Sequence, residues 1–326
     1  MFLLIFFCFW WLPFSFLGTH RYEKLISYDL VNHLIMHLAD EYALHFGEVV
    51  ISLPMILYTT GEGWKCFSSS RLLGHGEERI IYKGFYISEE GILIHKDDKA
   101  FYDFSITKNV VMMILAMCVL CLLFTRLASH LRKRSGKRLN GFWLILLYLV
   151  RFVRNDIARE IIGPKHYERF TPYLLTIFCY ILLQNILGLL PNGANVTGNI
   201  YVTATLALFT FITVVWNGTL DYWAHIFAPP EVPLLMYPIL VPIEIIGQLI
   251  KPALLAIRLC ANMFLGHMVL IFFVGAIFLA GDLRLAGIVV PISAAFTLLK
   301  IFVSFIQAQI FTVLSAVLIA GAVEKH

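Results

Sequence analysis

A long apolar stretch in the second half of the sequence carries polar side chains at regular spacing. Glu244, Lys251 and Arg258 are seven residues apart, and Gln248 and Asn262 fall on the same side of a helix. Seven residues are close to two helical turns, so one face of this helix is polar while the rest is apolar. An ionisable side chain at the centre of a bilayer costs about 2.5–3.5 kcal/mol. The stripe therefore indicates contact with water, with a paired charge or with the charge of a partner.

The last apolar stretch has a polar stripe of its own, formed by Ser293, Lys300, Ser304, Gln307 and Ser315. Two apolar helices with facing polar stripes are typical of a path for ions. For a single serine or glutamine, a hydrogen bond between helices without a transport role is the simpler interpretation. The charged residues therefore carry the hypothesis of an ion path.

Arg258 is the most informative of these residues, because its guanidinium stays protonated and a buried arginine needs a negative counterpart. Glu244 is about 21 Å away along a helix, and no other acidic residue lies nearby in the sequence. The counter-charge is thus expected on another chain or on a substrate. His267, nine positions after Arg258, lies about half a turn out of phase on a straight helix and exchanges protons near neutral pH.

The composition explains where these charges must be. Of the 326 residues, 60% are hydrophobic and 14% charged, with a mean hydropathy of +0.80. Soluble domains are about 45–50% apolar and about 25% charged, so an ordinary cytosolic enzyme, a disordered protein and a nucleic-acid binder are excluded. Residues 19–105 hold 8 Lys and Arg against 13 Asp and Glu, which is an ordinary soluble density of charge.

The apolar stretches predict five membrane helices, over 109–125, 170–190, 200–218, 234–280 and 288–323. The turn signal at 191–193 divides the second from the third, and a cytoplasmic loop over 221–233 and an external turn over 281–287 separate the rest. The last two stretches are about 54–70 Å long if helical, against a bilayer core of about 30 Å. They must be broken, strongly tilted or partly outside the membrane.

Basic residues orient the chain. Residues 126–138 contain six Lys and Arg and no acid, directly after the first span, which predicts a cytoplasmic position. The mixed segment 144–162 suits a helix on the cytoplasmic surface. Residues 19–105 then lie outside as a small α/β domain, with a helix over 28–46 and strands over 49–59 and 80–95. Residues 1–18 resemble a signal peptide, with a membrane anchor as the alternative.

Three segments in order resemble subunit a of F-type ATP synthases. Residues Lys251–His267, KPALLAIRLCANMFLGH, look like the signature of that family. Ile186–Leu208 resembles its turn and following helix, and Phe305–Leu314 resembles its last helix. The resemblance covers about 105–323, and it implies an all-α polytopic membrane protein whose two long segments form a tilted helical hairpin. Residues 106–326 would be the membrane proton-channel domain, whereas the resemblance gives no account of residues 19–105.

The resemblance also implies a role for each polar residue in a stator channel. The family's essential arginine falls on Arg258 and its nearby asparagine on Asn262. His267 takes a position that is Glu or His in relatives, and Gln307 matches the glutamine of the last helix. The remaining matches are Glu244, an acidic position of the cytoplasmic half of the pathway; Lys300, where His or Glu is common; and Asn199, where many relatives have Asp. The lysine argues against a simple His–Glu relay.

The partners implied by the resemblance are a rotating proteolipid c-ring with a membrane-buried carboxylate, peripheral-stalk b subunits, membrane lipids and, indirectly, the soluble catalytic sector. The chain would be a non-catalytic subunit of the bacterial inner membrane with a cytoplasmic C-terminus. No phosphate-binding glycine loop is present, so no cofactor is expected and no nucleic acid is involved.

Other interpretations fit the residues less well. A secondary transporter with Arg258 as an anion site would show inverted repeats, and none is seen. The interpretation as a receptor that senses a ligand through its external domain gives no role to the intramembrane charges. Asp29, His33, His37 and Asp40 share one helical face at metal-ligand spacing, but a solvated polar face is the default, so no metal is expected. Cys66 is the single cysteine of residues 19–105, so no disulfide forms within them.

Overall fold

A computed structural model of the chain describes residues 42–46, 49–72, 81–87, 93–96, 100–133, 141–189, 196–227, 236–280 and 283–323. These residues divide into two compact units, with the strands and the start of helix α3 in the first and the remaining helices in the second. The expected signal peptide, the four candidate metal ligands and the turn at 191–193 lie outside the described residues.

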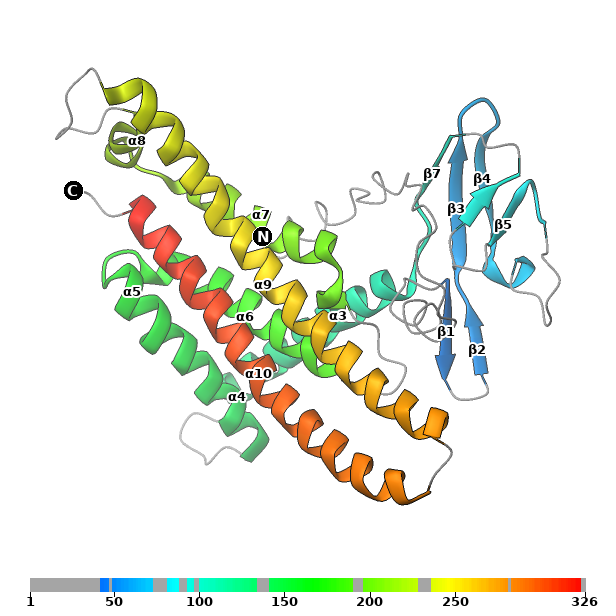
Figure 1. The fold of residues 1–326 in the computed structure, drawn as a ribbon. Helices are drawn as coiled ribbons and strands as arrows, with labels where there is room; N and C mark the ends of the chain where they lie inside the picture. Colours follow the sequence, from blue (N-terminus) through cyan, green and yellow to red (C-terminus); the bar gives the residue numbers. More distant parts are fainter. Residues whose placement is uncertain are drawn as a thin grey trace. The chain divides into compact units, whose positions relative to one another are not determined.

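The first unit is built from short antiparallel strands (Figure 1). They are β1 (Ala43–Phe46), β2 (Val49–Ser52), β3 (Pro54–Thr59), β4 (Gly63–Ser68), β5 (Phe85–Ile87), β6 (Leu93–His95) and β7 (Phe101–Asp103). Strands β4, β3 and β7 form a three-stranded sheet in that order, while β1 pairs with β2 and β5 with β6. A 3-10 turn, η2 (Ser69–Arg71), follows β4.

Alternation along β3 creates the core of this unit. Met55 and Leu57 are fully buried, whereas Ile56 and Tyr58 point to the other face, as the two-residue repeat of a strand requires. The buried cluster is completed by Phe67, Leu72, Phe85 and Leu93. One face of the β4–β3–β7 sheet is therefore apolar and covered, and the other face points outward.

Several sequence predictions for this unit need correction. The helix predicted over 28–46 is wrong at its end, because Ala43–Phe46 is strand β1, paired with Val49–Ser52. The strand predicted over 49–59 is interrupted at Leu53, and β4 and β7 were not anticipated. A short amphipathic pattern fits either a helix or a strand, and the pairing partner decides between them.

The second unit is helical. Helix α3 (Lys108–Lys133) begins in the first unit and ends in the second. It is followed by α4 (Gly141–Arg151), the π-helical segment η3 (Phe152–Arg159), α5 (Glu160–Ile162), α6 (Tyr167–Gly188), the 3-10 turn η4 (Val196–Gly198), α7 (Ile200–Asn217), α8 (Leu220–Phe227), α9 (Tyr237–Ala280) and α10 (Leu283–Val323).

Five helices of the described chain are long and apolar enough to cross a membrane, which confirms the expected number. They contain the segments Lys108–Arg132, Tyr167–Gly188, Ile200–Asn217, Tyr237–Gly266 and Val289–Val323. Helix α9, with 44 residues, is about 66 Å long at 1.5 Å per residue. Its length is more than twice a bilayer core of about 30 Å, as the sequence predicts.

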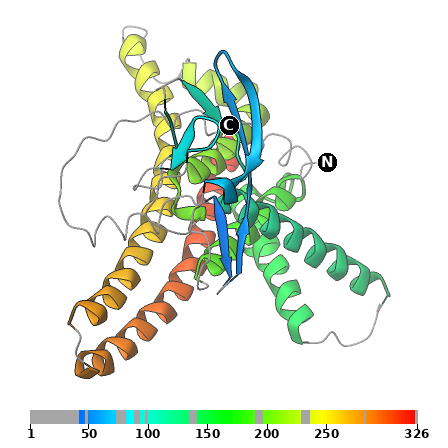
Figure 2. The same cartoon turned by 90° about the vertical axis from the view of Figure 1, so that its right-hand side faces the viewer.

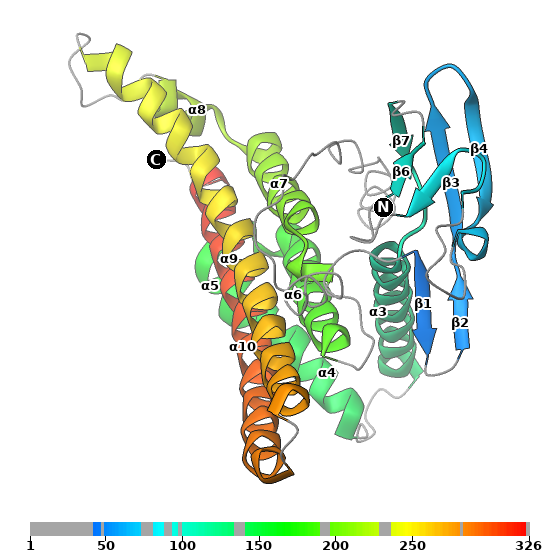
Figure 3. The same cartoon turned by 45° about the vertical axis from the view of Figure 1, so that its right-hand side comes forward.

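Helices α9 and α10 run antiparallel and side by side along most of their length, as all three ribbon views show (Figures 1, 2 and 3). Helix α6 packs on α10 and α7 packs on α9. Small side chains let the backbones approach, since Ala308 and Ala316 of α10 are completely buried. The two polar stripes therefore belong to neighbouring helices, which is what an ion path needs.

Two connections differ from the prediction. The loop expected over 221–233 contains helix α8 at Leu220–Phe227, and α10 begins at Leu283, within the turn expected over 281–287. The helix expected over 144–162 is present as α4, η3 and α5, with Val153, Ile157 and Ala158 buried on its inner face. Residues 220–227 form a short amphipathic helix. The Pro-rich residues that follow favour a loop, so the sequence does not predict this helix.

Candidate functional site

The polar stripe of α9 begins with a chain of hydrogen bonds. Gln248 Nε2 donates to Glu244 Oε1 at 3.1 Å, and Lys251 Nζ donates to Gln248 Oε1 at 3.3 Å. The pairs are four and three residues apart, which places neighbouring side chains on one helical face. Gln248 thus links an acid and a base that are too far apart to touch directly.

A cavity of about 480 Å³ opens beside this stripe and is called the wide cavity below. Glu244, Gln248, Lys251 and Arg258 all line it, so the structure brings together four residues of the sequence-predicted stripe. Its other walls come from α8, α9 and α10: Tyr222, Ile226, Leu254, Leu255, Leu314, Val317, Leu318 and Gly321.

Tyr222 is a member of this site that the sequence did not reveal. Helix α8 is held against the end of α10, because Thr219 N donates to Ala322 O at 2.9 Å. Burial and the nearby charge of Glu244 raise the pKa of Tyr222 above its usual value of 10.0. The phenol therefore stays protonated at neutral pH and presents a hydroxyl near the carboxylate. The sequence predicts a loop over this segment, and no periodic pattern there points to Tyr222.

A second, much smaller cavity lies further along the same helix pair and is called the narrow cavity. Its volume is about 20 Å³, enough for one water molecule. Asn262, Lys300 and Gln307, all predicted as site residues, line it together. The other lining residues are Asn185, Leu259, Met263, Val303 and Ser304.

Lys300 is tightly held in this region. A Cβ atom on Gly266 would lie 2.7 Å from Cε of Lys300, so the lysine side chain occupies the space that the glycine leaves free. Nζ of Lys300 is buried and has no hydrogen-bond partner among the described residues. A buried amine in this condition needs water or an anionic partner.

Asn185 of α6 is the second residue that sequence reasoning missed. Its side chain is buried, and its Oδ1 accepts a hydrogen bond from Thr197 Oγ1 at 2.7 Å. Thr197 lies in η4, so this bond ties the turn before α7 to α6. A polar pair, Gln184 and Asn185, within a charge-free span was the available signal.

Arg258 is positioned between the two cavities along α9. It lines the wide cavity, while the adjacent Leu259, which is buried, lines the narrow one. Its side chain is exposed on the helix surface, and no ion pair to it is found among the described residues. The negative counterpart inferred from the sequence is therefore not supplied by the described part of the chain.

Two predicted site residues are not among the described residues that line the cavities. Asn199 is the N-cap of α7, where its Oδ1 accepts from Tyr201 N at 2.9 Å, and it lines neither cavity. The backbone of His267 belongs to α9, but its side chain lies outside the described atoms. Within the described ranges, no group of three or more His, Cys, Asp or Glu residues has the geometry of a metal site.

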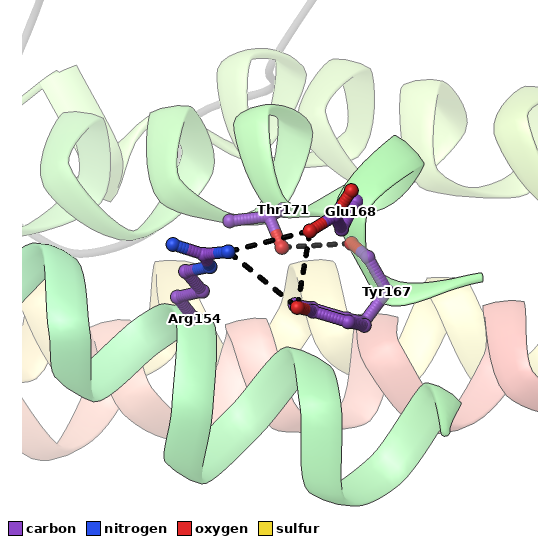
Figure 4. A network of polar contacts seen from close by, with 4 residues as sticks. All are labelled: Arg154, Tyr167, Glu168 and Thr171. Carbon is purple, nitrogen blue, oxygen red and sulfur yellow. Dashed lines mark hydrogen bonds and ion pairs between the residues drawn. The ribbon is translucent and has the colours of Figure 1, made fainter. Parts of the chain in front are cut away.

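A separate network connects η3 to the start of α6 (Figure 4). Arg154 Nη2 lies 3.3 Å from Glu168 Oε1 and 3.4 Å from Tyr167 OH, and that phenol donates to Glu168 at 3.1 Å. Thr171 Oγ1 donates to the carbonyl of Tyr167 at 2.7 Å. These contacts raise the pKa of Arg154, first through the hydrogen bond with Tyr167. The network is exposed and joins η3 to the first turn of α6.

Comparisons with known proteins find a family match over most of the helical unit. The family model described as ATP synthase A chain matches residues 110–320, and one described as a domain of unknown function matches residues 33–112. The chain is 40% identical to ATP synthase subunit a of Chlorobium phaeobacteroides (strain DSM 266) over 272 residues, covering 78% of this chain and 79% of the relative.

Two further relatives carry the same name. ATP synthase subunit a of Chloroherpeton thalassium is 41% identical, covering 69% of both chains, and that of Anaeromyxobacter sp. is 34% identical, covering 90% of this chain and 70% of the relative. Five membrane helices are present in the described chain, and the family match covers most of them. The chain therefore belongs to the ATP synthase subunit a family, multi-pass membrane proteins of the membrane sector of F-type ATP synthase that serve proton transport and ATP synthesis.

Proposed function

We propose that this chain is the stator that offers two offset half-channels for protons to a rotating c-ring. Each ring subunit would present one membrane-buried carboxylate. The observation that carries the proposal is the pair of cavities along one helix, with Arg258 between Glu244 on one side and Asn262 on the other. A single continuous pore would be a leak, whereas two separate cavities force the proton onto a carrier.

The wide cavity supports a path for proton release. Glu244 is a carboxylate next to Gln248 and Lys251 in a space that has room for a cluster of water molecules. A proton leaving the ring carboxylate would pass through this water to Glu244. The protonated Tyr222 hydroxyl supplies a further polar group on the same wall.

The narrow cavity supports a path for proton uptake. Asn262, Lys300 and Gln307 surround room for about one water molecule, which can relay a proton but leaves no room for a column of bulk water. His267 follows one residue after Gly266, the glycine that contacts Lys300, and belongs to this path in our proposal. Asn199 is assigned to its outer part on the strength of the resemblance, in addition to its capping of α7.

Arg258 keeps the two paths apart. Its fixed charge attracts the ionised ring carboxylate and repels a proton that would otherwise pass straight across. A carboxylate that has been protonated is neutral, so it can rotate into lipid at much lower cost. Each charge that crosses a potential of 100 mV supplies about 2.3 kcal/mol toward rotation.

The surface around Arg258 suits a partner in the membrane. Large apolar side chains of α9 and α10 are at least half exposed, among them Leu254, Ile257, Leu298, Leu299 and Phe302. Exposed apolar side chains on helices that also carry the fixed positive charge of Arg258 fit a ring of apolar helices with one carboxylate each. The remaining partners that we propose are the peripheral-stalk b subunits and, through them, the soluble catalytic sector.

We assign the chain to a bacterial inner membrane, with residues 19–105 extracytoplasmic and the C-terminus cytoplasmic. The basic residues 126–138 after the first span support this orientation through the positive-inside rule. Residues 1–18 are assigned as a signal peptide or anchor, and residues 106–326 as the proton-channel domain.

Sided labelling of cysteine variants tests the proposal. In the intact complex, with the native cysteines replaced, Gln248→Cys reports on the wide cavity and Ser304→Cys on the narrow one. A membrane-impermeant thiol reagent should react with Gln248→Cys only from the cytoplasmic side of oriented vesicles, whereas Ser304→Cys, at a cavity with room for about one water molecule, should not react from that side. Reaction of both from one side would refute two offset half-channels.

A further inference from the structure

Aromatic side chains gather on the outward face of the β4–β3–β7 sheet. Tyr58 of β3 is opposite Trp64 of β4 and Tyr102 of β7, so the three rings form a row across the sheet. The ring centroids of Tyr58 are 5.1 Å from Trp64 and 6.4 Å from Tyr102, and Phe104 extends the row, 5.3 Å from Trp64. These four residues are called the aromatic row.

Stabilisation of the sheet does not account for this row by itself. The core lies on the opposite face, where Met55 and Leu57 are fully buried. Trp64 is 65% exposed and Tyr102 39% exposed, so much of their apolar surface faces outward. A cross-strand aromatic pair contributes about 0.2–1 kcal/mol, and alternating polar residues would satisfy the outward face of an ordinary sheet.

The connection between the sheet and helix α3 limits how far the row can be from a bilayer. Phe104 is four residues before Lys108, where the candidate membrane span begins, and four residues reach at most about 14 Å. Lys108 and the first two turns of α3 belong to the same compact unit as the strands. The row is thus tied to the start of the span by at most about 14 Å of chain, which is about twice the roughly 5–7 Å thickness of one headgroup layer and limits how far the row can lie from that layer.

Hydrogen bonds make this connection rigid. Phe104 N donates to Ile56 O at 2.8 Å and Ile106 N donates to Pro54 O at 3.2 Å, so the residues after β7 continue along β3. In addition, Ile56 N donates to Ser105 Oγ at 3.1 Å. The sheet therefore holds the chain as far as Ile106, two residues before the span, so the connection is not a long loose linker.

From these observations we infer that the aromatic row lies against the bilayer surface and anchors the N-terminal unit to the phospholipid headgroups of the leaflet where α3 begins. Tryptophan and tyrosine prefer this layer, because the ring is apolar while the N–H or O–H remains hydrated. The unit would then have a fixed height on the membrane. This role is independent of the proposed half-channels and concerns the part of the chain that matches a domain of unknown function.

Photo-crosslinking in the assembled complex in its own membrane tests the inference. The photoreactive residue p-benzoyl-phenylalanine is introduced at Trp64 and, in a second variant, at Tyr102, where one ring replaces another and the fold is least disturbed. The same residue at Ile81 is the matched control, since Ile81 is an exposed apolar residue of the same unit, 51% exposed, outside the row.

After irradiation, mass spectrometry identifies what is attached. We expect phospholipid adducts at positions 64 and 102 in several-fold excess over position 81. Equal lipid adducts at all three positions, adducts to another subunit or to a cell-wall glycan at the row, or no adduct at either row position in assembled complex would each overturn the inference. ATP synthesis by the same membranes shows that the complex is intact. The adducts are compared only in membranes that synthesise ATP.

Discussion

The wide and narrow cavities lie along the same helix pair but differ in how their charged side chains are held. At the wide cavity, Glu244, Gln248 and Lys251 are joined by hydrogen bonds in a space of about 480 Å³. At the narrow cavity, of about 20 Å³, the amine of Lys300 is packed against Gly266 without a hydrogen-bond partner among the described residues. In the proposed mechanism, water volume would govern proton movement at the wide cavity and side-chain packing at the narrow one.

The largest effect is expected at the residue between the two cavities. Arg258→Ala removes the charge that separates the paths, and proton-driven ATP synthesis should fall by roughly 100-fold or more, as loss of one preorganised electrostatic group does in enzymes. ATP synthesis in energised membrane vesicles measures it, with Lys251→Ala, another cation of the wide cavity, as a milder control. Full synthesis by the alanine variant would remove Arg258 from the mechanism.

At the wide cavity, the carboxylate of Glu244 should be only partly replaceable. Glu244→Gln preserves a hydrogen-bond acceptor for Gln248 but cannot exchange protons, so transport should fall by less than the roughly 100-fold typical of a positioned acid or base, because water can substitute. The rate of ATP-driven proton pumping as a function of pH measures the effect. Glu244→Asp retains a carboxylate and should recover most of the rate; equal defects in both variants would contradict a proton-carrying role.

Adding one methyl group at a glycine near each cavity tests most directly whether the two cavities differ in packing. Gly266→Ala brings a Cβ within 2.7 Å of Cε of Lys300, so the flexible end of the lysine must shift, and the cost should be about 1 kcal/mol, the low end of the range for overpacking. Gly321→Ala adds the same atom to the wall of the wide cavity, where no heavy atom lies within 4 Å. It should be neutral or stabilise by about 0.5–1 kcal/mol through helix propensity.

Thermal unfolding of the assembled complex and proton pumping report on both glycine variants. The double variant Gly266→Ala with Lys300→Ala should regain stability relative to Gly266→Ala, with a coupling of about 0.5–3 kcal/mol. If Gly266→Ala and Gly321→Ala behave alike, the two cavities do not differ in packing and the comparison fails.

The smallest effect is expected away from both cavities. Glu168→Gln removes the charge that faces Arg154 at 3.3 Å, but both side chains are largely exposed. Exposed ion pairs contribute about 0–1 kcal/mol, so stability should change by no more than that and proton pumping should stay at the wild-type level. The salt dependence of thermal unfolding gives the measurement. A large loss of pumping would mean that the η3–α6 network is coupled to the channel.

Local patterns in the sequence were sufficient for several features. Continuous apolar stretches predicted the number of membrane helices, since the bilayer requires about 20 apolar residues per span. The spacing of Glu244, Lys251 and Arg258 predicted their common face, because helical periodicity is a property of one segment alone. The excess length of the last two stretches followed from the same arithmetic, and 44 residues are helical in α9.

Features that depend on contacts between distant segments were not accessible in this way. Tyr222 joins Glu244 because α8 is held to the end of α10 through Thr219, a contact across 103 residues. Asn185 joins Lys300 and Gln307 from a different helix. The polar pair that it forms with Gln184 is visible in the sequence, but it does not distinguish Asn185 from a residue that only hydrogen-bonds between helices. The strands of the first unit were predicted incompletely, since a short strand is stabilised by its partner and not by its own residues.

The sequence by itself determined which residues are charged within apolar helices and which of them share a face, because both follow from hydropathy and the helical repeat. The tertiary structure alone decided that the stripe opens into two cavities of unequal size. That outcome depends on how α8, α6 and α10 pack against α9, and in particular on one glycine, Gly266, that leaves room for Lys300. Packing of side chains from distant segments is a property of volume, which a one-dimensional pattern does not contain.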